Sequence, residues 1–205
     1  MRAEISETIA AALRRQAPEG WAWLEGRDRL TGFAGAGRRF AGPAGFSDHE
    51  AELLRAAGVA APEDWSLAEA ARAWALLAAS PDEVPRLFRT GDTAERVAIL
   101  KCLALLPDPA AHVGLAVEAL RSHVQDVFEA LACDNSYPAA WLPEPNFNQM
   151  VLKALFTGAP LSRVRGLSDR LNPTLVRMCA DYAAERRAAG RVVPPDIALI
   201  TGGPP

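Results

Sequence analysis

Cysteine is scarce in this chain, and its placement excludes two kinds of site. The three cysteines, Cys102, Cys133 and Cys179, lie far apart and are odd in number. They match neither a disulfide framework nor the close spacing of metal ligands, and no histidine pair has ligand spacing either. We therefore expect buried thiols in a reducing compartment, and no bound metal ion.

Long apolar runs and an excess of positive charge are also missing. No segment approaches the ~18 apolar residues of a membrane span. The opening MRAEISETIA alternates polar with apolar residues, unlike a secretory signal. The formal net charge is −3, whereas sequence-blind binding to nucleic acid requires clustered cations. We expect a cytoplasmic protein with no membrane span and no nucleic-acid partner.

Motifs for nucleotides and for β-structure are lacking too. Gly32 to Gly37 has GxxxxG spacing, but Arg38 and Arg39 stand where a phosphate loop needs Lys and Ser or Thr, and no apolar strand precedes it. We expect no nucleotide loop and no cofactor. The glycine-rich segment from 26 to 46 is predicted to be irregular, with Arg38, Arg39 and Phe40 available to line the edge of a cleft.

The chain does carry strong helical periodicity, together with capping residues at helix starts. Half of the residues are hydrophobic, which suits a folded core. Helices are predicted at about 5–16, 48–57, 66–79, 82–89, 92–106, 109–132, 146–157 and 173–189. The fold class is therefore all-α: antiparallel helix pairs in an irregular, solenoid-like (HEAT-like) array without a clean repeat. We predict one domain, 1–205, with a less regular part at 1–60 and an extended tail at 192–205.

One histidine–carboxylate pair lies on the predicted long helix, 109–132. His123 is at the border of its apolar stripe, and Asp126 follows within i, i+3 reach. A carboxylate beside an imidazole raises its basicity, as a general base or a ligand-polarising group requires. The alternative is a partly buried histidine satisfied by its helix neighbour. His49 and His112 are expected at the surface.

The segment 133–156, CDNSYPAAWLPEPNFNQMVLKALF, crowds amides between two apolar helices. Turn chemistry at Asp134 and a cap pair of Asn146 with Gln149 explain part of it. Asn148 falls on the apolar side of its helix, so we predict that it is buried and bonded to the 134–137 turn. Two interpretations stay open, turn chemistry alone or a ligand pocket. The pocket residues would be His123, Asp126, Asn135, Tyr137, Asn148 and Gln149, with His123, Tyr137 and Asn148 in one cavity.

The last third of the chain is rich in arginine. These residues are Arg163, Arg165, Arg170, Arg177, Arg186, Arg187 and Arg191. They form either a solvated face with local ion pairs or a docking face for an acidic partner, an anionic ligand or a lipid surface.

Two blocks of the sequence resemble the EboA domain family. They are EALRSHVQDVFEALACDNSYPAAWLPEPNFNQMVLKALF and LSRVRGLSDRLNPTLVRMCADYAAERRAAGR, over roughly residues 118 to 191. RRFAG and WSLAEAARAWALLA upstream resemble the family more weakly. The family's motif positions are occupied here by Asp126, Glu129, Asn135, Tyr137, Pro138, Asn148, Gln149, Lys153, Asn172, Pro173, Asp181, Tyr182, Glu185 and Arg186.

The resemblance implies a bacterial protein encoded beside a prenyltransferase-like membrane protein, a TatD-like hydrolase, and sugar-isomerase-like and phosphodiesterase-like proteins. It also implies a part in moving small, often aromatic, metabolites or their precursors toward the cell envelope. The leading hypothesis is a non-enzymatic protein that binds such a metabolite or a partner enzyme. The alternatives are an enzyme with His123 and Asp126 as an acid–base pair, and a scaffold that docks on a membrane-bound partner through its arginine-rich face.

Overall fold

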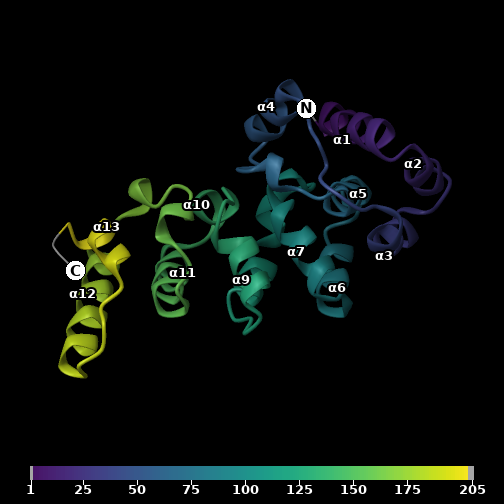
Figure 1. Cartoon of the computed structure of the whole chain (residues 1–205). Coiled ribbons are helices and arrows are strands. Elements are labelled where there is room, and N and C mark those ends of the chain that lie inside the picture. Colours follow the sequence, from purple (N-terminus) through teal and green to yellow (C-terminus); the bar gives the residue numbers. More distant parts are fainter. Residues whose placement is uncertain (1, 203–205) are drawn as a thin grey trace.

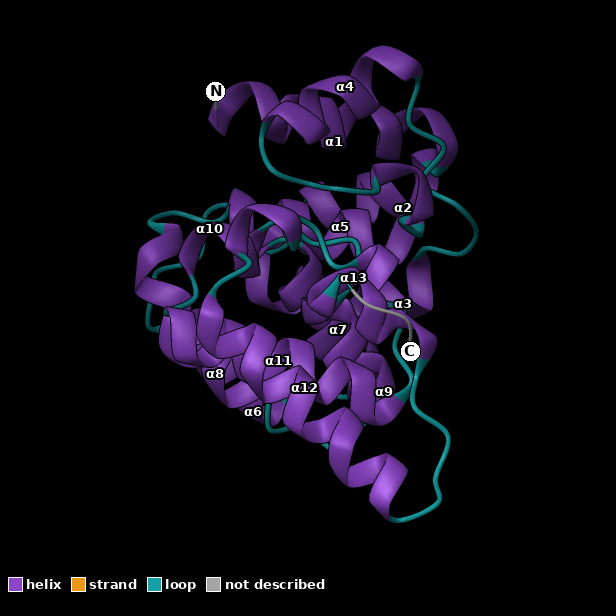
Figure 2. Ribbon diagram, turned by 90° about the vertical axis from the view of Figure 1, so that its left-hand side faces the viewer, coloured by secondary structure: helices purple, strands orange, loops and turns teal. Residues whose placement is uncertain are grey.

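The computed structural model describes residues 2–202. Within that range the chain forms thirteen α-helices and no β-strand, which confirms the all-α prediction (Figures 1 and 2). The helices are α1 (Arg2–Gln16), α2 (Pro18–Glu25), α3 (Arg29–Arg39), α4 (Asp48–Ala56), α5 (Leu67–Leu76), α6 (Glu83–Thr90), α7 (Thr93–Lys101), α8 (Val113–Ala119), α9 (Gln125–Ala132), α10 (Tyr137–Trp141), α11 (Glu144–Thr157), α12 (Pro173–Ala188) and α13 (Ala198–Thr201).

Capping boxes fix the starts of three helices. In each box the first side chain accepts from the backbone of the glutamate three residues later, and that glutamate accepts in return from the backbone of the capping residue. The pairs are Ser47–Glu50 for α4, Ser66–Glu69 for α5 and Asp92–Glu95 for α7. The last two were predicted as boxes and the first as a simple cap, so local sequence sets these boundaries.

The helices follow one another across the molecule in chain order, from α1–α3 at one end to α11–α13 at the other (Figure 1). Contacts join α3 to α5, α5 to α7, α7 to α9, α9 to α11 and α11 to α12. In the amino-terminal half, α3, α5, α7 and α9 therefore lie side by side in that order. Their neighbouring faces form one surface. A true repeat or solenoid arrangement stays a prediction.

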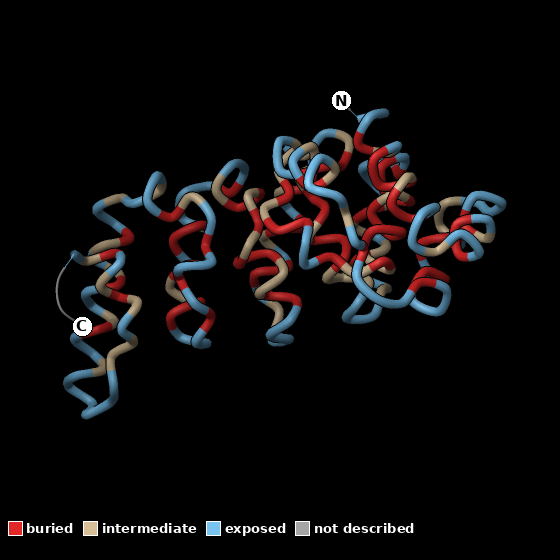
Figure 3. The backbone as a smooth tube through the Cα atoms, turned by 45° about the horizontal axis from the view of Figure 1, so that its top comes forward, coloured by how far each residue is buried: buried red, intermediate tan, exposed pale blue. Residues whose placement is uncertain are grey.

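One cluster of buried side chains extends along the whole array, from Ile5 in α1 to Ile200 in α13. Along each long helix the buried stretches alternate with exposed ones (Figure 3), as expected for amphipathic helices with one stripe facing a core. The division of the chain into a single domain stays a prediction.

The prediction that the glycine-rich segment is irregular is wrong, because residues 29–39 form α3. Asp28 caps the helix by accepting from the Thr31 amide at 2.9 Å. A Cβ at Gly35 would lie 2.3 Å from the Trp23 ring, and one at Gly32 would lie 2.6 Å from Leu24. The glycines therefore let α2 pack directly on the backbone of α3, which offsets their low helix propensity.

The prediction of one long helix over residues 109–132 is also wrong. Residues 109–112 form a 3-10 turn, α8 ends at Ala119, and α9 begins only at Gln125. The Lys153 ammonium of α11 donates to the carbonyls of Leu120 and Ser122, each at 2.6 Å. A tertiary contact thus satisfies the carbonyls that the break leaves free, and periodicity alone could not reveal it.

Two further boundaries differ from the prediction. The segment 137–141 is the short helix α10, and α11 begins at Glu144 without a side-chain cap. The prediction that Asn146 caps this helix is therefore wrong. In the tail, which was predicted to be extended, 195–197 and α13 are instead helical turns, and Ile197 and Ile200 are buried. Residues 203–205 of the predicted tail lie outside the described range.

None of the helices described is long and apolar enough to cross a membrane.

Candidate functional site

A groove of about 960 Å³ crosses α3, α5, α7 and α9. Each helix contributes residues three or four positions apart, which lie on one face of a helix. They are Ala34, Gly37 and Arg38 of α3; Ala68, Glu69 and Arg72 of α5; Thr93, Ala94, Val97 and Lys101 of α7; and Asp126, Glu129 and Ala130 of α9. The segment 59–66 and residues Asp92, Cys133, Asp134 and Arg163 complete the lining. The groove is therefore a property of the helix array, and it joins parts of the chain that are about a hundred residues apart.

Half of the charged side chains that line the groove form ion pairs within the protein. Lys101 binds Glu69 at 2.8 Å. Arg163 binds Asp134 at 2.7 Å and Glu129 at 3.3 Å, and these contacts raise the pKa of Arg163, with its hydrogen bond to Asp134 as the largest cause. The two salt-bridge clusters lie at opposite parts of the lining, one on α5 and α7 and one beyond α9.

Arg38 and Arg72 are the cations of the groove that form no ion pair among residues 2–202, and of these two only Arg72 is buried. Its side chain is 4% exposed, yet its Nε has no hydrogen-bond partner. Among residues 2–202 its guanidinium forms no ion pair, and its closest described contact is the Phe33 ring, with 5.9 Å from Cζ to the ring centroid. A Cβ at Gly37 would lie 2.9 Å from Nη2 of Arg72, so glycine at that position leaves room for the guanidinium. Arg72 is therefore a buried arginine that lines the groove and forms no ion pair within residues 2–202.

Arg72 was not among the site residues predicted from the sequence. Its neighbours in α5 are Ala70, Ala71 and Ala73, all buried, so the arginine stands on the apolar side of its helix. An arginine among small buried residues was the signal that could have identified it, since arginine is almost never buried without a pair.

Cys133 also lines the groove, but it is not a reactive thiol. Burial raises its pKa to about 11, partly opposed by the charge of Arg163. The thiol is therefore protonated at neutral pH, and a protonated thiol is a poor nucleophile. The prediction that the three cysteines are buried is confirmed, and all three are free.

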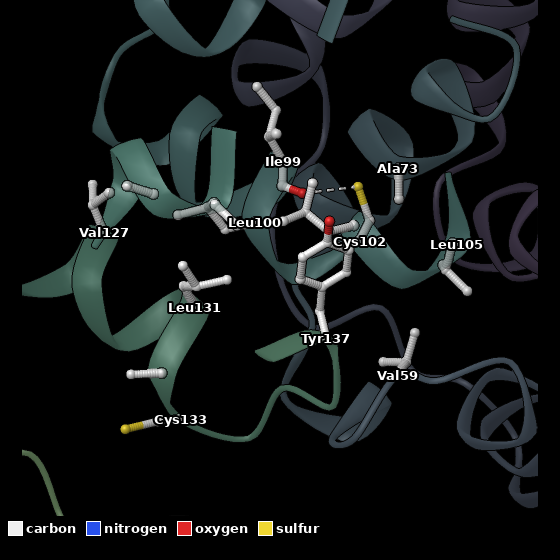
Figure 4. Close-up of a cluster of buried hydrophobic side chains, with 14 of the residues drawn as sticks. Val59, Ala73, Ile99, Leu100, Cys102, Leu105, Val127, Leu131, Cys133 and Tyr137 are labelled. Atoms are coloured by element: carbon white, nitrogen blue, oxygen red, sulfur yellow. Dashed lines mark hydrogen bonds between the residues drawn. The ribbon is translucent and has the colours of Figure 1, made fainter. Parts of the chain in front are cut away.

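Asn135 and Tyr137, both predicted to bind a ligand, make internal hydrogen bonds. Asn135 donates to the carbonyls of Leu100 and Ala130, each at 2.9 Å, and accepts from the Tyr137 amide at 2.9 Å. The Tyr137 hydroxyl donates to the Pro109 carbonyl at 2.6 Å. Figure 4 shows the Tyr137 ring among apolar side chains of the core, including Leu100 and Leu105. Burial raises the pKa of Tyr137 far above its usual range, so its hydroxyl stays protonated.

Asn148 is buried, as predicted, with 1% exposure. Its partner is Asn172 rather than the 134–137 turn: the two amides exchange hydrogen bonds at 3.2 and 3.0 Å. Asn172 also caps α12 by accepting from the Leu175 amide at 2.9 Å. The Asn148–Asn172 pair therefore joins the start of α11 to the start of α12.

The remaining predicted site residues are not brought together. His123 lies exposed in the bend between α8 and α9, and Asp126 is exposed in the first turn of α9. Within the described chain no hydrogen bond or ion pair joins these two side chains. Asp126 lines the groove, while Gln149 lines a second cavity of about 130 Å³ between α8 and α11. Neither cavity is lined by His123, Tyr137 or Asn148, so the single cavity predicted for these three residues stays a prediction. That the six residues bind a ligand stays a prediction.

His112, expected at the surface, is fully buried, and neither ring nitrogen has a partner. Burial lowers its pKa, opposed by the Pro107 backbone and the Asp108 carboxylate. His49 is exposed, as predicted. No group of three or more His, Cys, Asp or Glu side chains between residues 2 and 202 is placed to hold a metal ion.

The arginine-rich third makes internal contacts at several positions. Arg165 binds Asp134 at 3.1 Å. Arg170 donates to the carbonyls of Ala139 and Leu142 and lies over the Phe147 ring. Arg186 donates to the Val192 carbonyl. Local ion pairs and backbone contacts, one of the two interpretations, thus account for part of this charge.

Comparison with known proteins gives one match. The family described as metabolite traffic protein EboA matches residues 33–201. No curated protein and no solved structure matches the chain.

Proposed function

Since the chain belongs to the EboA family of metabolite traffic proteins, we propose that it binds a small metabolite in the groove over α3, α5, α7 and α9. The observation that carries this proposal is the groove itself. Its volume of about 960 Å³ lies at the upper end of the ~300–1,000 Å³ typical of small-molecule sites. Binding in transit toward the cell envelope is the function that this groove and the family membership support best.

The lining of the groove suits an amphipathic molecule. Trp65, Val97 and Ala61 supply apolar area, while Ser66 and Thr93 supply hydroxyl groups. Asp126 is the residue of the predicted ligand set that lies here, and it belongs to the proposed site. Asn135, Tyr137 and Asn148 would support the site from a distance, since their hydrogen bonds hold the loops and helix starts next to α9.

The acid–base alternative has lost its geometric premise. It required His123 and Asp126 one turn apart on a continuous helix, and that helix breaks between α8 and α9. The scaffold alternative retains Arg177, Arg187 and Arg191, which are exposed on and after α12. No acidic or membrane partner is identified by these three residues, so metabolite binding is the proposal that we advance.

Filling the groove tests the proposal. Ala94 is exposed at the start of α7 and lines the groove, whereas Ala184 is equally exposed on α12 outside it. Proteins purified from the native host, wild type, Ala94→Trp and Ala184→Trp, would be denatured and their released small molecules measured by mass spectrometry. We expect the wild type and Ala184→Trp to carry the same molecule, and Ala94→Trp to lose it. Retention of that molecule by Ala94→Trp, or no molecule on any of the three, would contradict the proposal.

A further inference from the structure

The charge of Arg72 has no counter-charge within reach in the described protein. Glu69, one turn earlier on α5, is the nearest candidate along the helix. Its carboxylate accepts from the Ser66 backbone at 2.7 Å and from Lys101 at 2.8 Å. The carboxylates of Glu129 and Asp134 are held by Arg163. Each of these three carboxylates is therefore paired with a cation other than Arg72.

Burying a charge without a partner is costly, because the protein interior solvates it far less well than water does. Within residues 2–202 no ion pair offsets this cost: the guanidinium lies near an aromatic ring and in the space left by Gly37. The cost is recovered when an anion enters the groove and forms hydrogen bonds with the guanidinium. An arginine fork matches the two oxygens of a carboxylate or a phosphate.

We propose that the metabolite bound in this groove is a carboxylate, and that Arg72 is the residue that binds its anionic group. This inference rests on the proposed function and names the class of its ligand. Six carboxylates and four basic side chains line the groove. That excess of negative charge disfavours a phosphate dianion more than a carboxylate monoanion. Trp65 and Val97 give the rest of the ligand apolar surface to contact.

The experiment compares three small probes that share one ring: benzoate, phenyl phosphate and benzamide. Their affinities for the full-length protein are measured by calorimetry. We expect benzoate to bind at least about tenfold more tightly than benzamide, because a hydrogen-bonded charge pair is lost in the neutral amide. Phenyl phosphate is expected to bind more weakly than benzoate.

Two variants test whether the preference for benzoate comes from Arg72 itself or from the overall charge of the groove. Arg72→Met is expected to abolish the preference for benzoate over benzamide. Arg38→Met removes a cation that lines the same groove but is exposed, and the preference should persist. In the wild type, the Nε–Hε NMR signal of Arg72, assigned by its loss in Arg72→Lys, should shift on addition of benzoate and stay in place with benzamide. This last measurement decides the question even when Arg72→Met does not fold.

The outcomes distinguish this inference from the proposed function. Equal binding of benzoate and benzamide, an unchanged preference in Arg72→Met, or an unmoved Arg72 signal overturns the role of Arg72, while the molecule lost from Ala94→Trp still supports binding in the groove. Tighter binding of phenyl phosphate than of benzoate overturns the assignment to a carboxylate. Failure of the proposed function itself is shown separately, by Ala94→Trp retaining the copurified molecule.

Discussion

Two regions of the molecule bury polar side chains, and they differ in whether the hydrogen bonds of those side chains are satisfied. In the amide-rich region around α10, α11 and the start of α12, Asn135 and Asn148 use both donors and acceptors on partners within the protein. In the groove over α3 to α9, Arg72 is buried to a similar degree and has no such partner. The first region contains more polar residues, and a ligand pocket was predicted there from the sequence for that reason.

We infer that the satisfaction of hydrogen bonds, rather than polarity, distinguishes the two structural asparagines from the arginine of the proposed site. A buried polar group whose hydrogen bonds are complete rigidifies the fold. A buried charge whose hydrogen bonds are incomplete is a cost to the free protein, and such strain concentrates at functional sites. Removing a residue of the first kind should destabilise the protein, while removing one of the second kind should not.

The largest expected effect is in the amide-rich region. Asn148→Ala removes the partner of Asn172, and the unsatisfied buried amide should lower the free energy of unfolding by about 1–3 kcal/mol. Urea denaturation measures it. The matched control is Gln149→Ala, one residue along the same helix but exposed, which should leave the midpoint close to that of the wild type. Equal effects of the two substitutions would contradict the stabilising role of the Asn148 hydrogen bonds.

A similar or slightly smaller effect is expected in α3, one of the helices that line the groove. Gly35→Ala would place a Cβ 2.3 Å from the Trp23 ring, and overpacking of this kind costs about 1–3 kcal/mol. Gly114→Ala is the matched control in α8, because no atom lies within 4 Å of its added Cβ. That control should stabilise the protein by roughly 0.5–1 kcal/mol, the difference in helix propensity. Destabilisation by both, or by neither, would show that α3 does not depend on its close contact with α2.

The smallest effect concerns His112, which is buried and unpaired but lines neither cavity. Burial lowers the pKa of its imidazole, so the unfolded chain binds a proton at a higher pH than the folded protein does. Stability from this residue is complete above the unfolded pKa of ~6.5 and is lost as the pH falls through the folded pKa. The urea midpoint of the wild type should therefore fall on acidification, and His112→Gln should fall less steeply. His49→Gln, at an exposed position, should follow the wild type.

The sequence predicted the fold class, the starts of α4, α5, α6, α7 and α12 to within one residue, and the burial of Asn148, because these depend on residues close in the chain. Capping boxes at Ser66 and Asp92 require only a pattern of four residues. The helicity of the glycine-rich segment and the break between α8 and α9 could not be predicted in this way. The first depends on Trp23 and Leu24 packing on glycine, and the second on Lys153, about thirty residues further along the chain.

The candidate site was predicted less well than the fold, for a related reason. Its residues come from four helices and several of the segments that connect the helices, and no local pattern predicts which of their faces meet. Asp126 was predicted and lines the groove, while Arg72 was missed because an arginine within an amphipathic helix ordinarily reaches solvent. Whether such a side chain has a partner is a property of tertiary structure alone.

One matched pair of substitutions tests the comparison most directly. Arg170 and Arg72 each lie near an aromatic ring, but Arg170 donates to the carbonyls of Ala139 and Leu142 and Arg72 donates to none. The measurement is the free energy of unfolding of Arg72→Met and Arg170→Met, each refolded from denaturant so that no ligand remains. Our account predicts that Arg170→Met is destabilised by about 1–3 kcal/mol, while Arg72→Met is as stable as the wild type or more stable. A loss of stability in Arg72→Met as large as that in Arg170→Met would contradict it.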